Sequence, residues 1–297
     1  QPAPKRLSVV GLGKLGSPMA AVFAKKGFEV IGVDVNPVFV EALNAGRAPV
    51  QEPDLQELID QHGKRITATT SYREAVLATD VTFIIVPTPS KADFFFSNDF
   101  VLKAIEEIGA ALCDKQDYHL VVVTSTVMPG STGGVIREAL EAASGRKVGD
   151  ELGLCYNPEF IALGSVVRDM LQPDMILIGQ SDEKAGLILE SIYRSSIDTH
   201  AEFQRMNWVN AELCKIAVNT YVTTKISYAN MIADMCDRLG GADADVVTRA
   251  LGADSRIGRK YIKGATGYGG PCFPRDNKAF VALARSIGAR ADLAEAT

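Results

Sequence analysis

The feature that most restricts the fold is a glycine motif placed between two apolar segments. Residues 7–10 are apolar and lead into Gly11-Leu12-Gly13-Lys14-Leu15-Gly16, residues 18–26 have helical periodicity, and residues 28–33 are again apolar and end at Asp34. A strand, GxGxxG, a helix, a second strand and an acid in this order predict a βαβ unit that binds a dinucleotide. The alternative is a glycine-rich turn in an unrelated α/β protein.

The residues of this motif are expected to hold the cofactor. Gly11 permits a tight turn, Gly13 lets the backbone approach the pyrophosphate, and Gly16 lets the helix pack closely on the strand. Backbone N–H groups at the helix start would face the phosphates. An acid after the second strand would accept hydrogen bonds from the ribose and repel a 2′-phosphate, which favours NAD over NADP. The expected cofactor-binding residues in this unit are Gly11, Gly13, Lys14, Leu15, Gly16 and Asp34.

Strand-like and helical segments continue to alternate up to about residue 200. Further strands are expected at residues 66–68, 81–86, 120–124, 153–156 and 175–179. Further helices are expected at residues 53–61, 71–79, 99–112, 131–143 and 182–195, with another that opens at Asn36-Pro37. Repeated β-α units of this kind predict an α/β domain over residues 1–200 with a Rossmann-like, doubly wound parallel sheet.

Polar residues follow three of the expected strands. They are Thr88 (within Pro87-Thr88-Pro89-Ser90), Thr126 and Glu159, which precedes Phe160. Ligands of open α/β sheets bind outside the carboxyl ends of the strands, so these residues are candidates for one wall of a site. The alternative for each residue alone is a turn or capping role, which Ser and Thr often have after strands. Pro87, Thr88 and Thr126 are assigned to the cofactor.

A long helical segment opens the second half of the chain. Residues 208–239 contain neither Gly nor Pro and are followed by Gly240-Gly241. This predicts one helix of about 45 Å as the spine of a mainly helical central domain, residues 201–297, and a candidate dimer interface. Glu212, Lys215 and Asn219 lie on one face of it. Lys215 is either an exposed lysine paired with Glu212 or a charge held at a site.

The most distinctive stretch is Gly267-Tyr-Gly-Gly-Pro-Cys272-Phe-Pro-Arg-Asp276. Its glycines and prolines exclude helix and central strand, so it is predicted to be a shaped loop that presents Cys272. Residues 277–287 have helical spacing, with Asp276 as the expected N-cap. A cysteine just ahead of a helix N-terminus is placed where the dipole favours a thiolate. The alternative is a structural cysteine buried in a turn.

Charge and cysteine usage exclude several function classes. Lys and Arg number 31 against 36 Asp and Glu, a net charge of −5, so no basic surface for nucleic acid or an anionic membrane is expected. No apolar run approaches the ~18 residues that span a bilayer. The five cysteines are scattered and the three histidines widely separated, which indicates a reducing cytoplasm and no metal site. The opening segment, residues 1–6, leads directly into a strand and is not expected to be a signal peptide.

Taken together, these motifs resemble the UDP-glucose/GDP-mannose dehydrogenase family over nearly the whole chain. The resemblance rests on Gly11–Gly16, Val86-Pro-Thr-Pro89, Ser125-Thr-Val127, Asn157-Pro-Glu-Phe160, Ala211-Glu-Leu-Cys-Lys-Ile216 with Asn219, and Gly269-Gly-Pro-Cys-Phe-Pro-Arg-Asp276. It implies two NAD-dependent oxidations that convert the primary alcohol of a nucleotide sugar to a carboxylate without release of the aldehyde.

The resemblance also implies a role for each matching residue. Cys272 would be the nucleophile that forms a thiohemiacetal and then a thioester, Lys215 and Asn219 would stabilise the oxyanion, and Asp276 would be the acid near that lysine. Thr126 and Glu159 would position water and move protons during thioester hydrolysis. Substrate contacts are expected from Phe160, Lys215, Asn219, Arg256, Lys263 and Gly269. Arg256 would reach into the neighbouring subunit, which implies a homodimer.

Two departures from the family pattern are visible. A second glutamate commonly stands four residues after the first in Asn-Pro-Glu-Phe, and here that position is Leu163. A third, C-terminal domain that binds the nucleotide is also expected from the family and has no counterpart in these 297 residues. The chain is therefore predicted to bind NAD but to have poor affinity for a nucleotide sugar. The motifs do not distinguish UDP sugars from GDP sugars. The alternatives are a two-electron β-hydroxyacid-type dehydrogenase and a non-catalytic NAD-binding domain.

Overall fold

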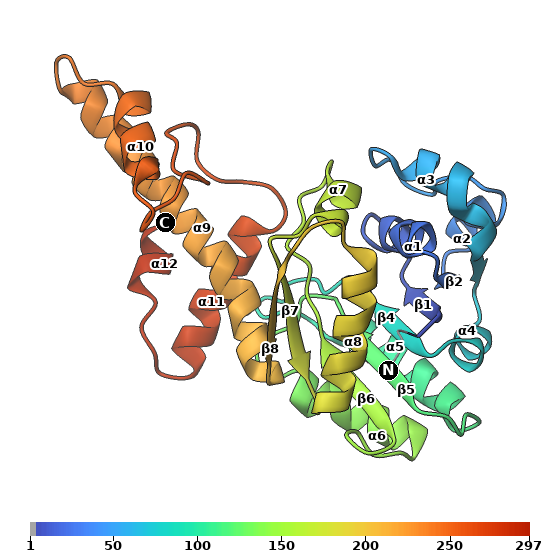
Figure 1. The fold of residues 1–297 in the computed structure, drawn as a ribbon. Coiled ribbons are helices and arrows are strands. Elements are labelled where there is room, and N and C mark those ends of the chain that lie inside the picture. The colour runs from blue at the N-terminus through green and yellow to red at the C-terminus, as the bar shows by residue number, and fades with distance from the viewer. Residues whose placement is uncertain (1–3) are drawn as a thin grey trace. The chain divides into compact units, whose positions relative to one another are not determined.

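The computed structural model describes residues 4–297 and divides them into two compact units (Figure 1). Residues 1–3, which belong to the opening segment considered above, lie outside the described residues. The first unit takes the chain up to Pro89 and then Ser97–Glu212. The second unit consists of Ser90–Phe96 and Leu213–Thr297.

The first unit is built on one eight-stranded sheet in the order β3-β2-β1-β4-β5-β6-β7-β8. The strands are β1 (Arg6–Val10), β2 (Glu29–Val33), β3 (Ile66–Thr69), β4 (Val81–Ile84), β5 (His119–Val123), β6 (Leu152–Tyr156), β7 (Met175–Gln180) and β8 (Glu202–Met206). Neighbours from β3 through β6 are all parallel, and the strand order reverses between β1 and β4. The predicted doubly wound sheet is confirmed, and such a reversal is where α/β sheets bind ligands.

The last two strands depart from the predicted parallel arrangement. β7 pairs antiparallel to β6, and β8 then pairs parallel to β7. The connection from β6 to β7 holds only α7 (Val166–Leu171), which the sequence pattern did not predict. Its six residues span about 9 Å, too little to carry the chain back along the sheet as a crossover helix does. The chain therefore re-enters the sheet from the edge at which β6 ends. β8, also not predicted, is a half-exposed strand at the sheet's end.

The helices of the first unit follow the predicted segments closely. They are α1 (Gly16–Lys25), α2 (Pro37–Asn44), α3 (Leu55–His62), α4 (Tyr72–Ala78), α5 (Asp99–Leu112), α6 (Arg137–Ser144) and α8 (Glu183–Ser196), with a 3-10 turn at Gly63–Arg65. Asn36 caps α2 as predicted, because its side chain accepts a hydrogen bond from the Val38 N–H. The segment predicted as one helix from 131 to 143 is instead a π turn, Thr132–Ile136, followed by α6. Gly134 there has non-helical backbone angles, which breaks the helix.

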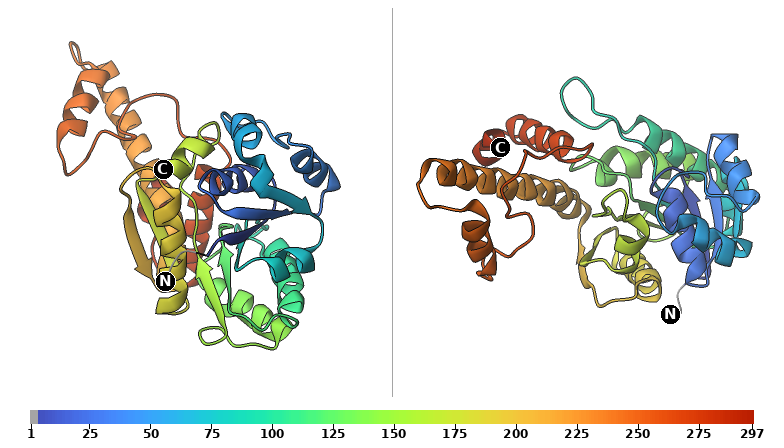
Figure 2. Two further views of the ribbon diagram at one scale, coloured as in Figure 1. Left: turned by 45° about the vertical axis from the view of Figure 1, so that its right-hand side comes forward. Right: turned by 90° about the horizontal axis from the view of Figure 1, so that it is seen from above.

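The second unit is helical and is organised on α9 (Trp208–Arg238), whose first five residues belong to the first unit. Its 31 residues run without interruption, which confirms the predicted long helix (Figure 2). The other helices are α10 (Ala244–Ala253), α11 (Phe273–Ser286) and α12 (Asp292–Ala296). The segment Ser90–Phe96 packs on α11, where the Arg275 guanidinium lies 3.9 Å from the centre of the Phe96 ring.

One predicted detail of α11 is wrong. The helix begins at Phe273, so Cys272 is its N-cap residue and Asp276 lies inside the first turn. Pro274 near the helix start is the reason, because proline's missing N–H and fixed φ suit a first turn. Asp276 is instead buried, with 3% of its surface exposed.

A buried polar chain crosses the sheet of the first unit. His119 on β5 is fully buried, its Nε2 lies 2.8 Å from the Thr82 hydroxyl, and Thr82 in turn lies 2.7 Å from the Ser8 hydroxyl. The Lys115 ammonium lies 3.1 Å from His119 Nδ1. Because an ammonium only donates, Nδ1 must accept, so His119 is neutral and carries its proton on Nε2. Burial, and then the charge of Lys115, hold the pKa of His119 well below its ordinary value.

This arrangement predicts a pH dependence of stability. A histidine whose pKa is depressed in the folded state stabilises the fold above its unfolded pKa of about 6.5, and the stabilisation is lost as pH falls below that value. We expect the free energy of unfolding to fall by up to about 1.4 kcal/mol per pH unit more in the wild type than in His119→Gln. Urea unfolding at pH 7.5, 6.5 and 5.5 measures the difference. The exposed His200→Gln is the control, and equal slopes for wild type and His119→Gln would contradict the prediction.

Candidate functional site

The glycine motif forms a backbone cradle between β1 and α1. Gly11 has φ +96°, and a Cβ there would lie 2.1 Å from the Ile85 carbonyl oxygen just after β4. A Cβ on Gly16 would lie 1.7 Å from the Gly11 carbonyl oxygen. Neither position has space for any side chain. Gly13 differs, because a Cβ there would meet no atom within 4 Å. Gly13 therefore borders open space that a ligand could occupy.

Asp34 closes this cradle at the end of β2. One of its carboxylate oxygens accepts a hydrogen bond from the Leu12 N–H at 2.6 Å, and the other accepts from the Asn36 N–H at 2.8 Å. The acid is thus fixed beside the glycine motif. Lys14 is exposed and Leu15 is the N-cap residue of α1. The residues fit a dinucleotide: they leave room at Gly13, present a helix N-terminus and hold an acid at the ribose position.

The loops after β4 and β5 are joined to each other. The Thr88 hydroxyl donates to the Thr126 carbonyl oxygen at 2.8 Å. The Ser125 hydroxyl lies 2.8 Å from the Val86 carbonyl oxygen and 2.9 Å from the Val86 N–H. Thr88 and Thr126, two of the three residues predicted to share a position at strand ends, are therefore brought together. Ser125 was not singled out, although its place directly after the strand was a signal for such a role.

Glu159, in the loop after β6, is held by a residue that the sequence did not suggest. The Tyr193 hydroxyl, from α8, lies 2.8 Å from Glu159 Oε1 and 2.5 Å from Asn157 Oδ1. Asn157 also donates to the Leu177 carbonyl oxygen at 2.9 Å. Burial, and then the charge of Glu159, hold the pKa of Tyr193 well above its ordinary value. Tyr193 therefore stays a neutral phenol.

Glu212 binds a loop of the first unit, a role that the sequence did not suggest. It is fully buried, and its two carboxylate oxygens accept from the Gly130 N–H at 2.6 Å and the Thr132 N–H at 2.7 Å. Burial raises the pKa of Glu212, and these hydrogen bonds oppose the rise. The residue ties the start of α9 to the loop that follows Thr126. Lys215 is only 8% exposed, so an exposed lysine is excluded.

In the second unit, Cys272 stands beside a buried polar group. Cys272 is exposed and caps α11, and its carbonyl oxygen accepts from the Asp276 N–H at 2.8 Å. Asp276 Oδ2 accepts from Asn219 Nδ2 at 2.6 Å. Burial raises the pKa of Asp276, while the hydrogen bond from Asn219 and the charges of Lys215 and Arg275 lower it. One cluster thus contains Lys215 and Asn219, from α9, and Asp276, from the first turn of α11. Cys272 lies directly before that turn.

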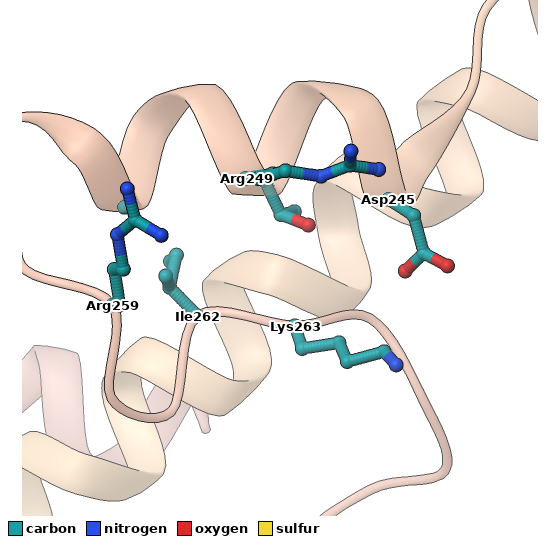
Figure 3. Close-up of a pocket in the computed structure, with 7 residues that line it drawn as sticks. Asp245, Arg249, Arg259, Ile262 and Lys263 are labelled. Carbon is teal, nitrogen blue, oxygen red and sulfur yellow. The ribbon is translucent and has the colours of Figure 1, made fainter.

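The cationic residues ahead of the cysteine loop separate into two places. Lys263 and Arg259 line a hollow of about 290 Å³ together with Asp245, Thr248, Arg249, Gly252 and Ile262 (Figure 3). Arg256 lies outside this set and forms an ion pair with Asp254 at 2.6 Å. The structure therefore does not bring Arg256 and Lys263 into one pocket of the chain. Gly269 is exposed and Phe160 is partly buried.

Several other features of the described residues bear on the type of site. All five cysteines are free thiols. Within residues 4–297 there is no group of three or more His, Cys, Asp or Glu side chains arranged to hold a metal ion. No helix in that range is long and apolar enough to cross a membrane.

Two domain models of one protein family match successive parts of this chain. The model of the UDP-glucose/GDP-mannose dehydrogenase family, NAD binding domain, matches residues 5–197, and that of the family's central domain matches residues 209–297. The chain is 40% identical to a UDP-glucose 6-dehydrogenase of Haloferax volcanii over 285 residues, which cover 95% of this chain and 66% of that protein. It is 34% identical to a GDP-mannose 6-dehydrogenase of Pseudomonas aeruginosa over 286 residues, 95% of this chain and 65% of that protein.

A solved structure is also similar to this chain over its whole length. A UDP-glucose dehydrogenase from Pyrobaculum islandicum superimposes with a TM-score of 0.90 at 39% identity, over 100% of this chain and 67% of that one. The chain spans about two thirds of the length of the curated relatives that it matches. Two family models, placed in order over both units, and relatives at 34–40% identity lead to one conclusion. The chain belongs to the UDP-glucose/GDP-mannose dehydrogenase family.

Proposed function

We propose that this chain carries the cofactor and the reacting residues of an enzyme that oxidises the C6 primary alcohol of a nucleotide sugar to a carboxylate. The observation that carries the proposal is the exposed Cys272 at the start of α11. The first turn of that helix holds the buried Asp276, which forms a cluster with the buried Lys215 and the partly buried Asn219. A presented thiol next to donors for an oxyanion suits the oxidation of an aldehyde through a covalent thioester. The substrate is a UDP or GDP sugar.

NAD is the cofactor that we assign to the glycine cradle. When bound, it accepts a hydride from the substrate carbon in each of two oxidations. Gly13 leaves space for the pyrophosphate, and the start of α1 offers backbone N–H groups to it. Asp34, already fixed by two backbone N–H groups, accepts from the ribose hydroxyls and disfavours a 2′-phosphate. Pro87, Thr88 and Thr126 border the same edge of the sheet.

Cys272 forms the covalent bond to the substrate. Its thiolate adds to the carbonyl carbon of the aldehyde, the C=O π electrons move to oxygen, and a thiohemiacetal results. Lys215 and Asn219 supply the positive charge and the N–H that stabilise this oxygen. Asp276 holds the Asn219 amide in place through their 2.6 Å hydrogen bond and interacts electrostatically with Lys215. After the second oxidation the substrate is a thioester on Cys272.

Thr126 and Glu159 act in the hydrolysis that follows. A water molecule held by them attacks the thioester carbon, Glu159 takes a proton from the water, and the C–S bond breaks with Cys272 leaving as the thiolate. Thr126 and Glu159 come from adjacent strands, β5 and β6. The product is the sugar carboxylate.

The phosphate-bearing part of the substrate needs cationic contacts. Lys263 supplies one, and the hollow that it lines with Arg249 and Arg259 offers three cations against the single acid Asp245. Phe160 and Gly269 are further expected contacts. We assign Arg256, which is exposed and paired with Asp254 of its own loop, to the site of a second subunit. The five free thiols favour a reducing cytoplasm as the compartment.

A homodimer through α9 completes the proposal. Tyr221, Tyr228, Met231 and Met235 stand three, four or seven residues apart on α9, and Leu239 follows the helix end. All five are between 46% and 64% exposed. Apolar residues exposed in one stripe along a helix indicate a partner surface.

The glycine cradle gives a test of the cofactor site. We expect Gly13→Ala to weaken NAD binding at least about tenfold with little change in melting temperature, because its Cβ meets only open space in the protein. Gly16→Ala should destabilise the fold by about 1–3 kcal/mol, because its Cβ overlaps the Gly11 carbonyl oxygen. Calorimetric NAD titration and thermal unfolding separate the two effects. Wild-type NAD affinity in Gly13→Ala would refute this cofactor site.

Product stoichiometry tests the reaction. We expect the natural full-length protein to form about two NADH per sugar acid, and Cys272→Ser to lose acid formation by at least about a thousandfold. Cys113→Ser, which changes the other exposed cysteine, should leave turnover unchanged. A panel of UDP and GDP sugars, followed by absorbance and mass spectrometry, gives the measurement. One NADH per substrate together with an active Cys272→Ala would support the two-electron alternative, and NAD binding with no hydride transfer would support a non-catalytic domain.

Sedimentation tests the dimer. We expect Met231→Glu with Met235→Glu to raise the dimer dissociation constant by about a hundredfold, because each carboxylate would be buried without a partner. Val38→Glu, at an exposed apolar position on α2, should sediment as the wild type does. A wild-type chain that is monomeric at micromolar concentration would overturn the assignment of this stripe.

A further inference from the structure

We propose that Tyr193 is a positioning residue that orients the carboxylate of Glu159 for thioester hydrolysis. This inference rests on the proposed function, and it adds a residue that none of the sequence motifs contains. Tyr193 lies on α8, 34 residues after Glu159, and is 5% exposed. Its hydroxyl lies between Glu159 Oε1, at 2.8 Å, and Asn157 Oδ1, at 2.5 Å.

Asn157 is held by backbone contacts with the two strands that flank β6. The Asn157 N–H donates to the Val123 carbonyl oxygen at the end of β5, at 2.8 Å. The Asn157 side-chain amide donates to the Leu177 carbonyl oxygen on β7, at 2.9 Å. Since that amide nitrogen is turned to Leu177, the amide oxygen is the atom that faces Tyr193, and it can only accept. The position of the Tyr193 hydroxyl is therefore fixed from the sheet.

The Tyr193 hydroxyl cannot donate to both of its neighbours at once. The phenol has one proton and two acceptors, Asn157 Oδ1 and Glu159 Oε1. When Glu159 is a carboxylate, both oxygens compete for that proton. When Glu159 has taken a proton from the attacking water, it can donate to the phenol oxygen, and the phenol can donate to Asn157. Every group is then satisfied in one chain, Glu159 to Tyr193 to Asn157.

This chain therefore favours the state in which Oε1 of Glu159 carries the accepted proton, and it fixes the position of that oxygen. In the step itself, the water oxygen bonds to the thioester carbon, the C–S bond breaks, Cys272 leaves as a thiolate, and one water proton moves to Glu159. No oxidant or other reactant is needed. A phenylalanine at position 193 would remove the phenol oxygen that accepts the hydrogen bond from protonated Glu159, and it would leave Asn157 Oδ1 without its donor.

The test is a pre-steady-state measurement on the natural full-length protein. We expect Tyr193→Phe to slow release of the sugar acid about ten- to hundredfold, while the two NADH equivalents still form in a burst. The thioester on Cys272 should then accumulate and be visible by intact-protein mass spectrometry. The KM values for NAD and for the sugar nucleotide should remain near those of the wild type. A merely structural role would lower all steps together and would not trap the thioester.

Two comparisons sharpen this test. Tyr118→Phe is the matched control, since it removes a buried tyrosine hydroxyl of the same unit that has no hydrogen-bond partner among the described residues. It should leave all rates unchanged. In a double-mutant cycle, Tyr193→Phe should cost little once Glu159→Gln is present, because the effect of Tyr193 passes through that carboxylate. Additive losses, or wild-type hydrolysis in Tyr193→Phe, would overturn the inference.

If Tyr193→Phe does not fold, 3,5-difluorotyrosine at position 193 keeps the shape and the hydroxyl while changing its strength as a donor. The rate of thioester hydrolysis should then change with no change in melting temperature, and an unchanged rate would overturn the inference. A wild-type protein that forms no acid from any nucleotide sugar would refute the proposed function and this inference with it. A wild type that forms acid, with fully active Tyr193→Phe, would refute the inference alone.

Discussion

The first unit depends on the contact of three backbone segments at Gly11 and Gly16. The start of α1 lies on the carbonyl group of Gly11, and Gly11 lies on the carbonyl group of Ile85 after β4. Any Cβ would hold these segments apart, since it would fall within about 2 Å of a carbonyl oxygen. The contact lies where the strand order reverses, between β1 and β4. The same close packing leaves open space at Gly13, so the constraint that builds the sheet also shapes the cofactor cradle.

Around this cradle, buried side chains hold the loops that follow the strands. Ser125 joins the loops after β4 and β5, and Glu212 holds the next part of the β5 loop through two backbone N–H groups. Tyr193 holds the loop after β6. Each tie connects a polar group on a helix or strand end to a loop far away in sequence. Candidate reacting residues on those loops, Thr126 and Glu159, are thereby preorganised before any ligand binds.

Much of the fold could be predicted because it follows from local periodicity. The strands β1 to β7 and all the longer helices lie within a few residues of their predicted positions. The candidate site residues were identified from motifs typical of the family. The structure brings Lys215, Asn219 and Asp276 of this set together. Errors arose where local signals were ambiguous. Asp276 is a residue type that often caps helices. Because Pro274 favours a first turn, the helix instead begins earlier in the chain, at Phe273, and Asp276 is buried inside it.

The sequence by itself determined the alternation of strands and helices, the glycine cradle with Asp34, the long helix α9 and a loop that presents Cys272, because each depends on residues close together in the chain. Only the tertiary structure decided that β7 runs antiparallel, that Glu212 binds backbone N–H groups and that Tyr193 meets Glu159. These contacts join residues that are tens of positions apart. Their partners are selected by packing and by the need to satisfy every buried polar group, which no local pattern records.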